Sequence, residues 1–147
     1  PTIRRQLMND GVRRGDIISY PYLWQWQVEE NPDREHGEKD RPVCMILTIT
    51  DKQGLTHLLL LPISSKPPFE GPDAIEVPGL ELRRAKLTGY ERGWITVSEC
   101  NYDVLERSYY LDSGQKPVGR FSDAFLEKVR QAFAPFLATG SVRVNRT

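Results

Sequence analysis

The sequence has no net charge, few cysteines and no long hydrophobic run, and each shortage excludes a class of protein. Its 20 lysines and arginines balance 20 aspartates and glutamates, so no overall field favours a nucleic acid, a membrane surface or an acidic partner. The longest apolar run, Leu58 to Leu61, is too short to span a bilayer, and no signal-peptide pattern is present. We therefore expect a soluble, cytoplasmic protein in which any anion-binding site is local.

Cysteine and histidine are too sparse to predict a metal centre. The two cysteines, Cys44 and Cys100, lie in apolar, strand-like segments, and neither belongs to a CxxC or Cys/His spacing. His57 has no second ligand at a matching spacing, which favours a half-exposed side chain over a metal ligand. The sequence predicts buried free thiols, no metal site and no cofactor.

The chain length and the strand patterns predict one mainly β domain. A chain of 147 residues can form one domain with a core but not two comfortable ones. Residues 1–14 show neither helical nor strand periodicity, which predicts an N-terminal arm, and residues 15–147 form the expected domain. Strand patterns occupy residues 17–22, 43–50, 56–63, 74–77 and 94–100, with a further short strand at 109–111.

One amphipathic helix follows the strands. Ser122 is a good N-cap, and apolar residues recur at helical spacing up to Leu137. Pro135 predicts a kink or a restart within this helix, and Gly140 predicts its end. Short strands followed by one helix predict a small, strongly curved β-barrel closed by a C-terminal helix.

Proline and tryptophan mark the irregular parts of the chain. Pro21 predicts an early end or an edge position for the first strand, and Pro62 predicts a break in the strand ladder. The connection 23–40 is expected to be a long loop, either a functional lid or a disordered segment. Trp24 and Trp26 at its start could stack on nucleobases, although such aromatics are more often anchors of a core or an interface.

Arg41 is the leading candidate for anion binding. Pro42 restricts Arg41 to extended geometry, so its guanidinium leaves a stiff backbone at the start of an apolar strand. A rigid and permanently charged fork suits an anionic ligand. The alternative is a solvated arginine, or one paired with the nearby Glu38 or Asp40.

Hydroxyl and basic side chains supply further candidates for phosphate contact. Ser64, Ser65 and Lys66 follow a strand and could cradle a phosphate, or they could be ordinary turn residues. A second basic cluster either contacts phosphate or is simply solvated, and it consists of Arg83, Arg84 and Lys86.

Four short segments occur in a particular order: Gly15-Asp16-Ile17-Ile18, Arg41-Pro42 before an apolar strand, Pro62-Ile63-Ser64-Ser65, and Gly93-Trp94-Ile95-Thr96-Val97-Ser98-Glu99. Together they resemble the motifs of the MazF/PemK-type toxins of bacterial toxin–antitoxin pairs, and the C-terminal helix agrees in position. The resemblance implies an SH3-like barrel, usually a homodimer. It also implies a metal-independent endoribonuclease that cleaves single-stranded RNA and is inhibited by a small acidic antitoxin.

The resemblance assigns roles to some residues and departs at others. Arg41 matches the family's arginine before proline, and Ser64 or Ser65 matches its hydroxyl residue, so these residues would bind the scissile phosphate. A family glutamate about five positions earlier is replaced by His36, which lies between Glu35 and Glu38. The family's late-strand arginine and aspartate are replaced by Thr96 or Val97 and by Ser98 or Glu99.

The resemblance implies cleavage in which the substrate's own 2′-hydroxyl is the nucleophile. Such a reaction needs a cation at the phosphate, a proton acceptor and a proton donor to the leaving oxygen. Arg41 would supply the cation, whereas the acceptor stays open among Glu35, His36 and Glu38. Further RNA contacts are expected from basic and aromatic side chains, namely Lys66, Arg83, Arg84, Lys86, Trp24 and Trp26.

Two other functions remain open. The same fold could be a non-catalytic SH3-like module that binds nucleic acid or a protein partner, which the neutral net charge and the absent late-strand arginine favour. It could also be an autoregulatory subunit that acts on DNA only with its antitoxin, although the sequence has no helix-turn-helix pattern.

Overall fold

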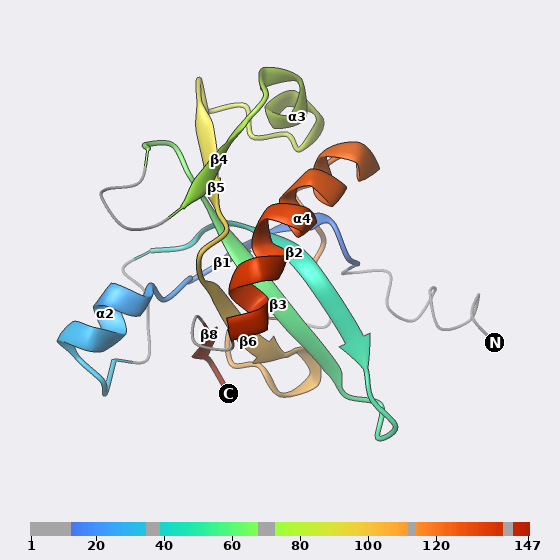
Figure 1. The fold of residues 1–147 in the computed structure, drawn as a ribbon. Coiled ribbons are helices and arrows are strands. Elements are labelled where there is room, and N and C mark those ends of the chain that lie inside the picture. Colours follow the sequence, from blue (N-terminus) through green and yellow to red (C-terminus); the bar gives the residue numbers. More distant parts are fainter. Residues whose placement is uncertain (1–12, 35–38, 68–72, 112–113, 140–142) are drawn as a thin grey trace.

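The computed structural model describes residues 13–34, 39–67, 73–111, 114–139 and 143–147, and these parts of the chain are mainly β (Figure 1). The strands are β1 (Asp16–Tyr20), β2 (Arg41–Thr50), β3 (Thr56–Ser64), β4 (Ala74–Val77), β5 (Gly93–Thr96), β6 (Cys100–Val104), β7 (Gly119–Arg120) and β8 (Arg143–Asn145). The helices are α2 (Gln25–Glu30), α3 (Gly79–Arg84) and α4 (Asp123–Thr139), together with the short 3₁₀ helix η1 (Leu105–Arg107).

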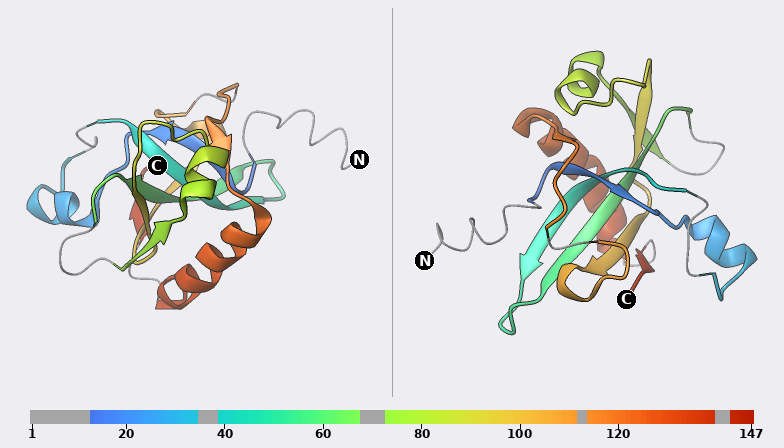
Figure 2. Two further views of the ribbon diagram at one scale, coloured as in Figure 1. Left: turned by 90° about the horizontal axis from the view of Figure 1, so that it is seen from above. Right: turned by 180° about the vertical axis from the view of Figure 1, so that it is seen from behind.

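Strand β3 is the centre of the sheet. One edge of β3 pairs with β2, while its other edge pairs first with β6, up to Leu60, and then with β5, from Ile63. The strand order is β4-β5-β3-β2-β1-β7, with β6 on β3 and β8 parallel to β6. The two branches curl around β3 into a strongly curved, mainly antiparallel half-barrel (Figure 2). The expected mainly β fold with a C-terminal helix is confirmed.

Both faces of β2 and β3 are buried, which explains their nearly continuous apolar sequence. One face packs against α4, which buries Phe125, Val129 and Phe133. The opposite face is covered by the segment after β1 and by the η1 region, including Tyr22 and Leu105. The ends of these strands therefore carry the residues that remain within reach of a ligand.

The two cysteines are buried free thiols, as the sequence predicts. Cys44 and Cys100 form no disulfide, and burial raises the pKa of each thiol to about 12. Both side chains are therefore protonated at neutral pH and contribute to the core as small apolar groups.

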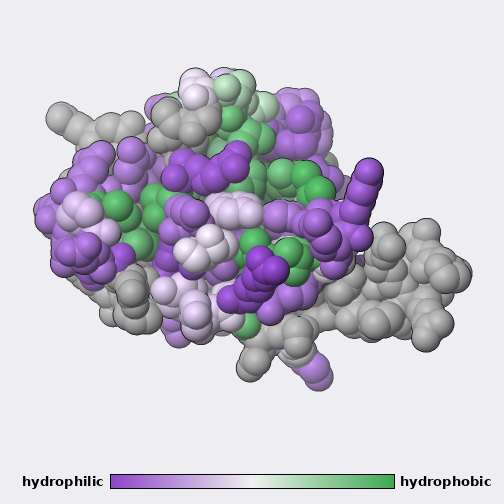
Figure 3. Space-filling view, turned by 90° about the horizontal axis from the view of Figure 1, so that it is seen from below, coloured by the Kyte–Doolittle hydropathy of each residue, from purple (hydrophilic) through white to green (hydrophobic). Residues whose placement is uncertain are grey.

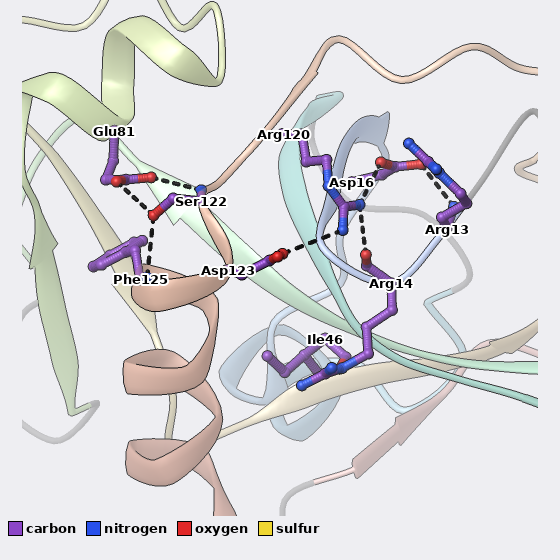
Figure 4. A network of polar contacts seen from close by, with 9 residues as sticks. All are labelled: Arg13, Arg14, Asp16, Ile46, Glu81, Arg120, Ser122, Asp123 and Phe125. Carbon is purple, nitrogen blue, oxygen red and sulfur yellow. Dashed lines mark hydrogen bonds and ion pairs between the residues drawn. The ribbon is translucent and has the colours of Figure 1, made fainter.

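Helix α4 begins with a polar cap that joins it to α3 (Figure 4). The Phe125 N–H donates to Ser122 Oγ at 3.2 Å, as an N-cap requires. Ser122 in turn donates from its backbone nitrogen and from its hydroxyl to the buried carboxylate of Glu81, at 2.8 Å in each case. The predicted N-cap is confirmed, and it also satisfies a buried carboxylate.

A second network fixes the start of β1 (Figure 4). Buried Asp16 accepts hydrogen bonds from the Arg13 backbone nitrogen at 2.6 Å and from Arg120 Nη1 at 3.1 Å. Arg120 Nη1 also donates to the Arg14 carbonyl, and Arg14 Nε donates to the Ile46 carbonyl. Residues 1–12 of the expected arm lie outside the described residues, whereas Arg13 and Arg14 contact the domain.

The expected break at Pro62 is wrong. Strand β3 continues through Pro62 to Ser64. Residues 61 and 62 lie between the β6 pairs and the β5 pairs, so one edge of β3 has no partner at this point. A residue without an N–H is tolerated where a ladder is interrupted.

The expected single strand over residues 94–100 is also wrong. Strand β5 ends at Thr96 and β6 begins at Cys100, because the chain bends between them. At the start of the bend, the Val97 N–H donates to the Asp73 carbonyl at 2.9 Å, directly beyond the last β4–β5 pair, Ala74 with Thr96.

Three further predictions need correction. The connection 23–40 contains α2, which begins after Trp24, and the Trp24 N–H donates to Gln27 Oε1 at 2.9 Å. Residues 109–111 form no strand, because the Tyr110 and Leu111 N–H groups both donate to Ser108 Oγ. Helix α4 continues through Pro135 without the expected restart.

None of the helices in the described ranges has the length and apolar composition that crossing a membrane requires.

Candidate functional site

Arg41 and Ser64 lie at neighbouring ends of two paired strands. The β2–β3 pairing ends at Val43 and Pro62, so Arg41, which begins β2, and Ser64, which ends β3, each lie two residues beyond the last pair. The predicted pairing of an arginine with a hydroxyl residue at neighbouring strand ends is therefore consistent with the register of the sheet.

The two residues share a face with aromatic side chains. Arg41 also pairs with Tyr20 of β1, and Ser64 pairs with Trp94 of β5. Directly paired residues of an antiparallel sheet point to the same side. We call this side the Arg41 face, defined by Tyr20, Arg41, Ser64 and Trp94, and it is opposite to the side that packs on α4.

Arg41 is half-buried and has no counter-ion among the described residues. Its guanidinium carbon lies 5.3 Å from the ring centroid of Trp24. Its Nε is buried without a hydrogen-bond partner, and among the described residues, Asp40 included, it forms no ion pair. Burial raises the pKa of the nearby Tyr90, and the charge of Arg41 opposes that rise. A partly desolvated cation without a partner favours binding of an anion.

Ser64 has an ordinary turn role in this structure. Its hydroxyl donates to the Lys66 carbonyl at 3.0 Å, which closes the turn after β3. Ser65 and Lys66 are exposed beside it. A phosphate contact by Ser64 would require its hydroxyl to leave the Lys66 carbonyl, whereas Ser65 and Lys66 can reach a ligand directly.

One tryptophan ring contacts Arg41, and two others lie on separate elements. Trp24 packs edge-on against Tyr22, with 5.1 Å between ring centroids, and forms the platform beneath the guanidinium. Trp26 on α2 is 47% exposed. Trp94 lies under the guanidinium of Arg92, at 4.9 Å from the ring centroid. The tryptophans predicted to contact RNA are therefore divided into a packed platform, Trp24, and an exposed ring, Trp26.

A row of buried polar residues on β6 supports the segment that carries Trp24. Asn101 accepts a hydrogen bond from the Leu23 N–H at 2.9 Å and donates to the Leu23 carbonyl at 2.7 Å. Asp103 accepts from the Tyr20 hydroxyl at 2.8 Å. Asn101 and Asp103 are absent from the predicted site, although polar residues at every second position are a usable signal in the sequence.

Glu99 continues this row towards α2. Its Oε2 accepts hydrogen bonds from the Tyr22 hydroxyl and from the Gln25 N–H, each at 3.0 Å. Burial raises the pKa of Glu99, and these two hydrogen bonds oppose the rise. Because the residue is only 6% exposed, it is better suited to hold the Trp24 segment than to exchange protons with a substrate.

Arg146 holds the same segment from the other side. Its Nη1 donates to the Pro21 carbonyl at 2.8 Å and to Asn101 Oδ1 at 3.1 Å. Its guanidinium also lies 4.2 Å from the ring centroid of Tyr110. The backbone that leads into Trp24 is therefore fixed by side chains from β6 and from the residue after β8.

Thr96 occupies one of the positions at which the resemblance would have an arginine. Its hydroxyl is buried, has no hydrogen-bond partner, and belongs to a residue that is 1% exposed. It therefore adds no charge to the Arg41 face and is closed to a ligand in this conformation.

The second basic cluster lies elsewhere. Arg83 and Arg84 are exposed on α3, and Lys86 follows them with a positive φ of 61°. Figures 1 and 2 show α3 and the tryptophan-bearing α2 at different ends of the molecule. The structure does not gather all the predicted RNA contacts into one patch.

The proposed proton acceptors cannot be placed, because Glu35, His36 and Glu38 lie outside the described residues. His57 is half-buried between Asp51 Oδ2, at 2.8 Å from Nε2, and the Tyr102 hydroxyl, at 2.7 Å from Nδ1. In the part of the chain that the structure describes, no cluster of three or more His, Cys, Asp or Glu side chains could hold a metal ion.

Comparison with known proteins adds no assignment. No protein-family model and no curated protein matches the sequence. The resemblance to the MazF/PemK-type toxins therefore stays a prediction, and the function has to be argued from the Arg41 face.

Proposed function

We propose that the Arg41 face binds a phosphate of single-stranded RNA and cleaves the adjacent bond, as a metal-independent endoribonuclease of toxin type. One observation carries this proposal: Arg41 is a half-buried guanidinium on a stiff strand end, with no ion pair among the described residues. Ser64 ends β3, the strand paired with β2, and exposed Ser65 and Lys66 follow it, so these residues supply further donors to phosphate oxygens.

The reaction would transfer the phosphate within the RNA. The 2′-oxygen attacks phosphorus and loses its proton to a base, while the bond to the 5′-oxygen breaks and that oxygen takes up a proton. The products are a 2′,3′-cyclic phosphate and a 5′-hydroxyl end. Arg41 stabilises the charge that develops on the phosphate, without changing its own protonation.

The proton acceptor stays among Glu35, His36 and Glu38, which precede Arg41 in the sequence. His36 is the acceptor best suited to neutral pH, because an ordinary imidazole titrates close to it. Glu99 keeps a positioning role, since its Oε2 already accepts two hydrogen bonds.

The SH3-like identity of the barrel, the homodimer and the small acidic antitoxin are parts of the same proposal, and they depend on the resemblance. The curled sheet with a C-terminal helix supports the first of these, the barrel, at the level of architecture.

The second candidate function is a module that binds single-stranded nucleic acid without cleaving it. Buried Thr96 at a position of the family's late-strand arginine favours this candidate, because the site then holds one fewer cation. Binding through Arg41, Trp24 and Trp26 would still be possible.

Product analysis separates the two functions. Purified protein is incubated, with chelator present, with a single-stranded RNA and with the same sequence as DNA, and the products are analysed by mass spectrometry. The endoribonuclease predicts fragments of the RNA alone that end in 2′,3′-cyclic phosphate. Intact RNA that is nevertheless bound would establish the non-catalytic module, and intact RNA without binding would reject both.

A further inference from the structure

A surface hollow lies next to the Arg41 face, because Tyr110 and Arg146 of its lining contact the ring of Tyr20. It has a volume of about 510 Å³, and Leu23, Arg34, Tyr109, Tyr110 and Arg146 contribute to its lining. Leu23 precedes Trp24, the platform beneath Arg41, so the hollow and the Arg41 site share one backbone segment. A hollow of this size can take a nucleotide-sized ligand.

Tyr109 is the unusual side chain of this hollow. It is 90% exposed, so its ring contributes almost nothing to the core. The adjacent Tyr110 is fixed, because its ring meets Tyr20 edge-on at 5.9 Å and its N–H donates to Ser108 Oγ at 3.0 Å. An exposed ring on a fixed backbone is the arrangement on which single-stranded nucleic-acid binders stack bases.

The charge of the lining suits the same ligand. Arg34 contributes a guanidinium group, whereas the buried guanidinium of Arg146 is bonded to the Pro21 carbonyl and Asn101, and the described residues that line the hollow include no acidic side chain. Its lining includes Leu23 and Arg34, on either side of α2, and Asn145 of β8, and both elements lie in the lower part of Figure 1. From below, that side is largely hydrophilic, with separate hydrophobic patches (Figure 3). A nucleotide, which joins a flat base to a phosphate, therefore suits this hollow better than a purely apolar ligand does.

We propose that this hollow binds a nucleobase of single-stranded RNA, stacked on Tyr109, close along the strand to the phosphate held by Arg41. The inference rests on the proposed function only in its RNA binding, not in its cleavage. It adds a second contact with the RNA, besides the contact with the reacting phosphate.

Binding to uncleavable RNA tests the proposal. Labelled single-stranded 2′-O-methyl oligonucleotides, one of about 4 and one of about 12 nucleotides, are titrated and followed by fluorescence anisotropy. Stacking predicts that Tyr109→Ala weakens binding of the longer oligonucleotide about tenfold, while Tyr109→Phe binds as the wild type does. The matched control is Leu80→Ala, which removes another exposed apolar side chain, on α3, and should leave binding unchanged.

The outcomes distinguish this inference from the proposed function. Wild-type affinity of Tyr109→Ala for the longer oligonucleotide, with Arg41→Ala weakened, would overturn the base site and leave the RNA site at Arg41 intact. Equal weakening by Tyr109→Phe and Tyr109→Ala would also overturn it, because the ring would then not be the binding element. Absence of binding by the wild type would reject both proposals.

Discussion

At the scale of single residues, Arg41 differs from Arg120 and Arg146 because its side chain has no ion pair or hydrogen bond to any of the described residues. Arg120 reaches Asp16 at 3.1 Å, and Arg146 donates to the Pro21 carbonyl. Within the described part of the chain, Arg41 contacts the ring of Trp24, and its buried Nε has no hydrogen-bond partner. A cation–π contact supplies about 0.5–2 kcal/mol, whereas an anion would also satisfy the buried N–H group.

Glu99 gives a prediction at the same scale. Burial raises its pKa in the folded protein, so the folded state binds this proton more tightly than the unfolded state does. The resulting stability is fully present below the ordinary glutamate pKa and is lost as the pH rises through the raised value. Glu99→Gln cannot ionise and keeps an oxygen for Tyr22 and Gln25, so its free energy of unfolding should exceed that of the wild type increasingly from acid to neutral pH.

Urea denaturation at several pH values measures this difference. The matched control is Glu127→Gln, because the ion pair with Arg130 lowers the pKa of Glu127. The difference in stability between Glu127→Gln and the wild type should have the opposite pH dependence, because the wild type loses the contribution of Glu127 as the pH falls. A pH-independent difference between Glu99→Gln and the wild type would show that Glu99 is not desolvated.

At the scale of secondary-structure elements, two contacts fix α3 against its neighbours. The first is the N-cap of α4. Ser122→Ala should lower the free energy of unfolding by about 1–2 kcal/mol, because it removes both the cap and a donor to buried Glu81. The measurement is urea denaturation, with Ser65→Ala as the control. Ser65 is exposed, so its replacement should change the free energy of unfolding by less than about 0.5 kcal/mol. Equal stability of the two variants would contradict the role of the cap.

The second contact is the close approach of β7 to the end of α3. A Cβ at Gly119 would overlap the backbone carbonyl of Ala85, which cannot move aside as a side chain can. Gly119→Ala should therefore cost about 1–3 kcal/mol of stability. Gly114→Ala is the control, because nothing lies within 4 Å of its added Cβ. Thermal unfolding of both variants measures the difference, and a Gly119→Ala variant as stable as Gly114→Ala would contradict this packing.

At the scale of the whole molecule, the sequence predicts the class of fold, which the structure confirms, and Arg41 as the leading residue of the site, which stays a prediction. The apolar strands around the hairpin and the cap at Ser122 are local signals, so they could be identified without the structure. The change of partner along β3 near Pro62 could not be identified from the sequence, because the pairing of β3 with β6 and then with β5 is non-local. The support of Trp24 by Asn101 is equally non-local, since these residues are far apart in the sequence.

The oligomeric state is a further whole-molecule prediction. The sheet ends in the short strands β4 and β7, and exposed strand edges are commonly covered by a partner. We expect a homodimer, with a mass twice the 16.9 kDa of the chain, by sedimentation equilibrium over micromolar concentrations. A mass of one chain across that range would reject the dimer.

The central claim is that the half-buried guanidinium of Arg41 acts on an RNA phosphate. Its most direct test is the single-turnover cleavage rate of a single-stranded RNA by the wild type, Arg41→Ala and Arg130→Ala. Arg130 is the matched control, an arginine on α4 paired with Glu127 at 2.6 Å. The account predicts a rate about 100-fold or more lower for Arg41→Ala and an unchanged rate for Arg130→Ala. Cleavage by Arg41→Ala at the wild-type rate would contradict it.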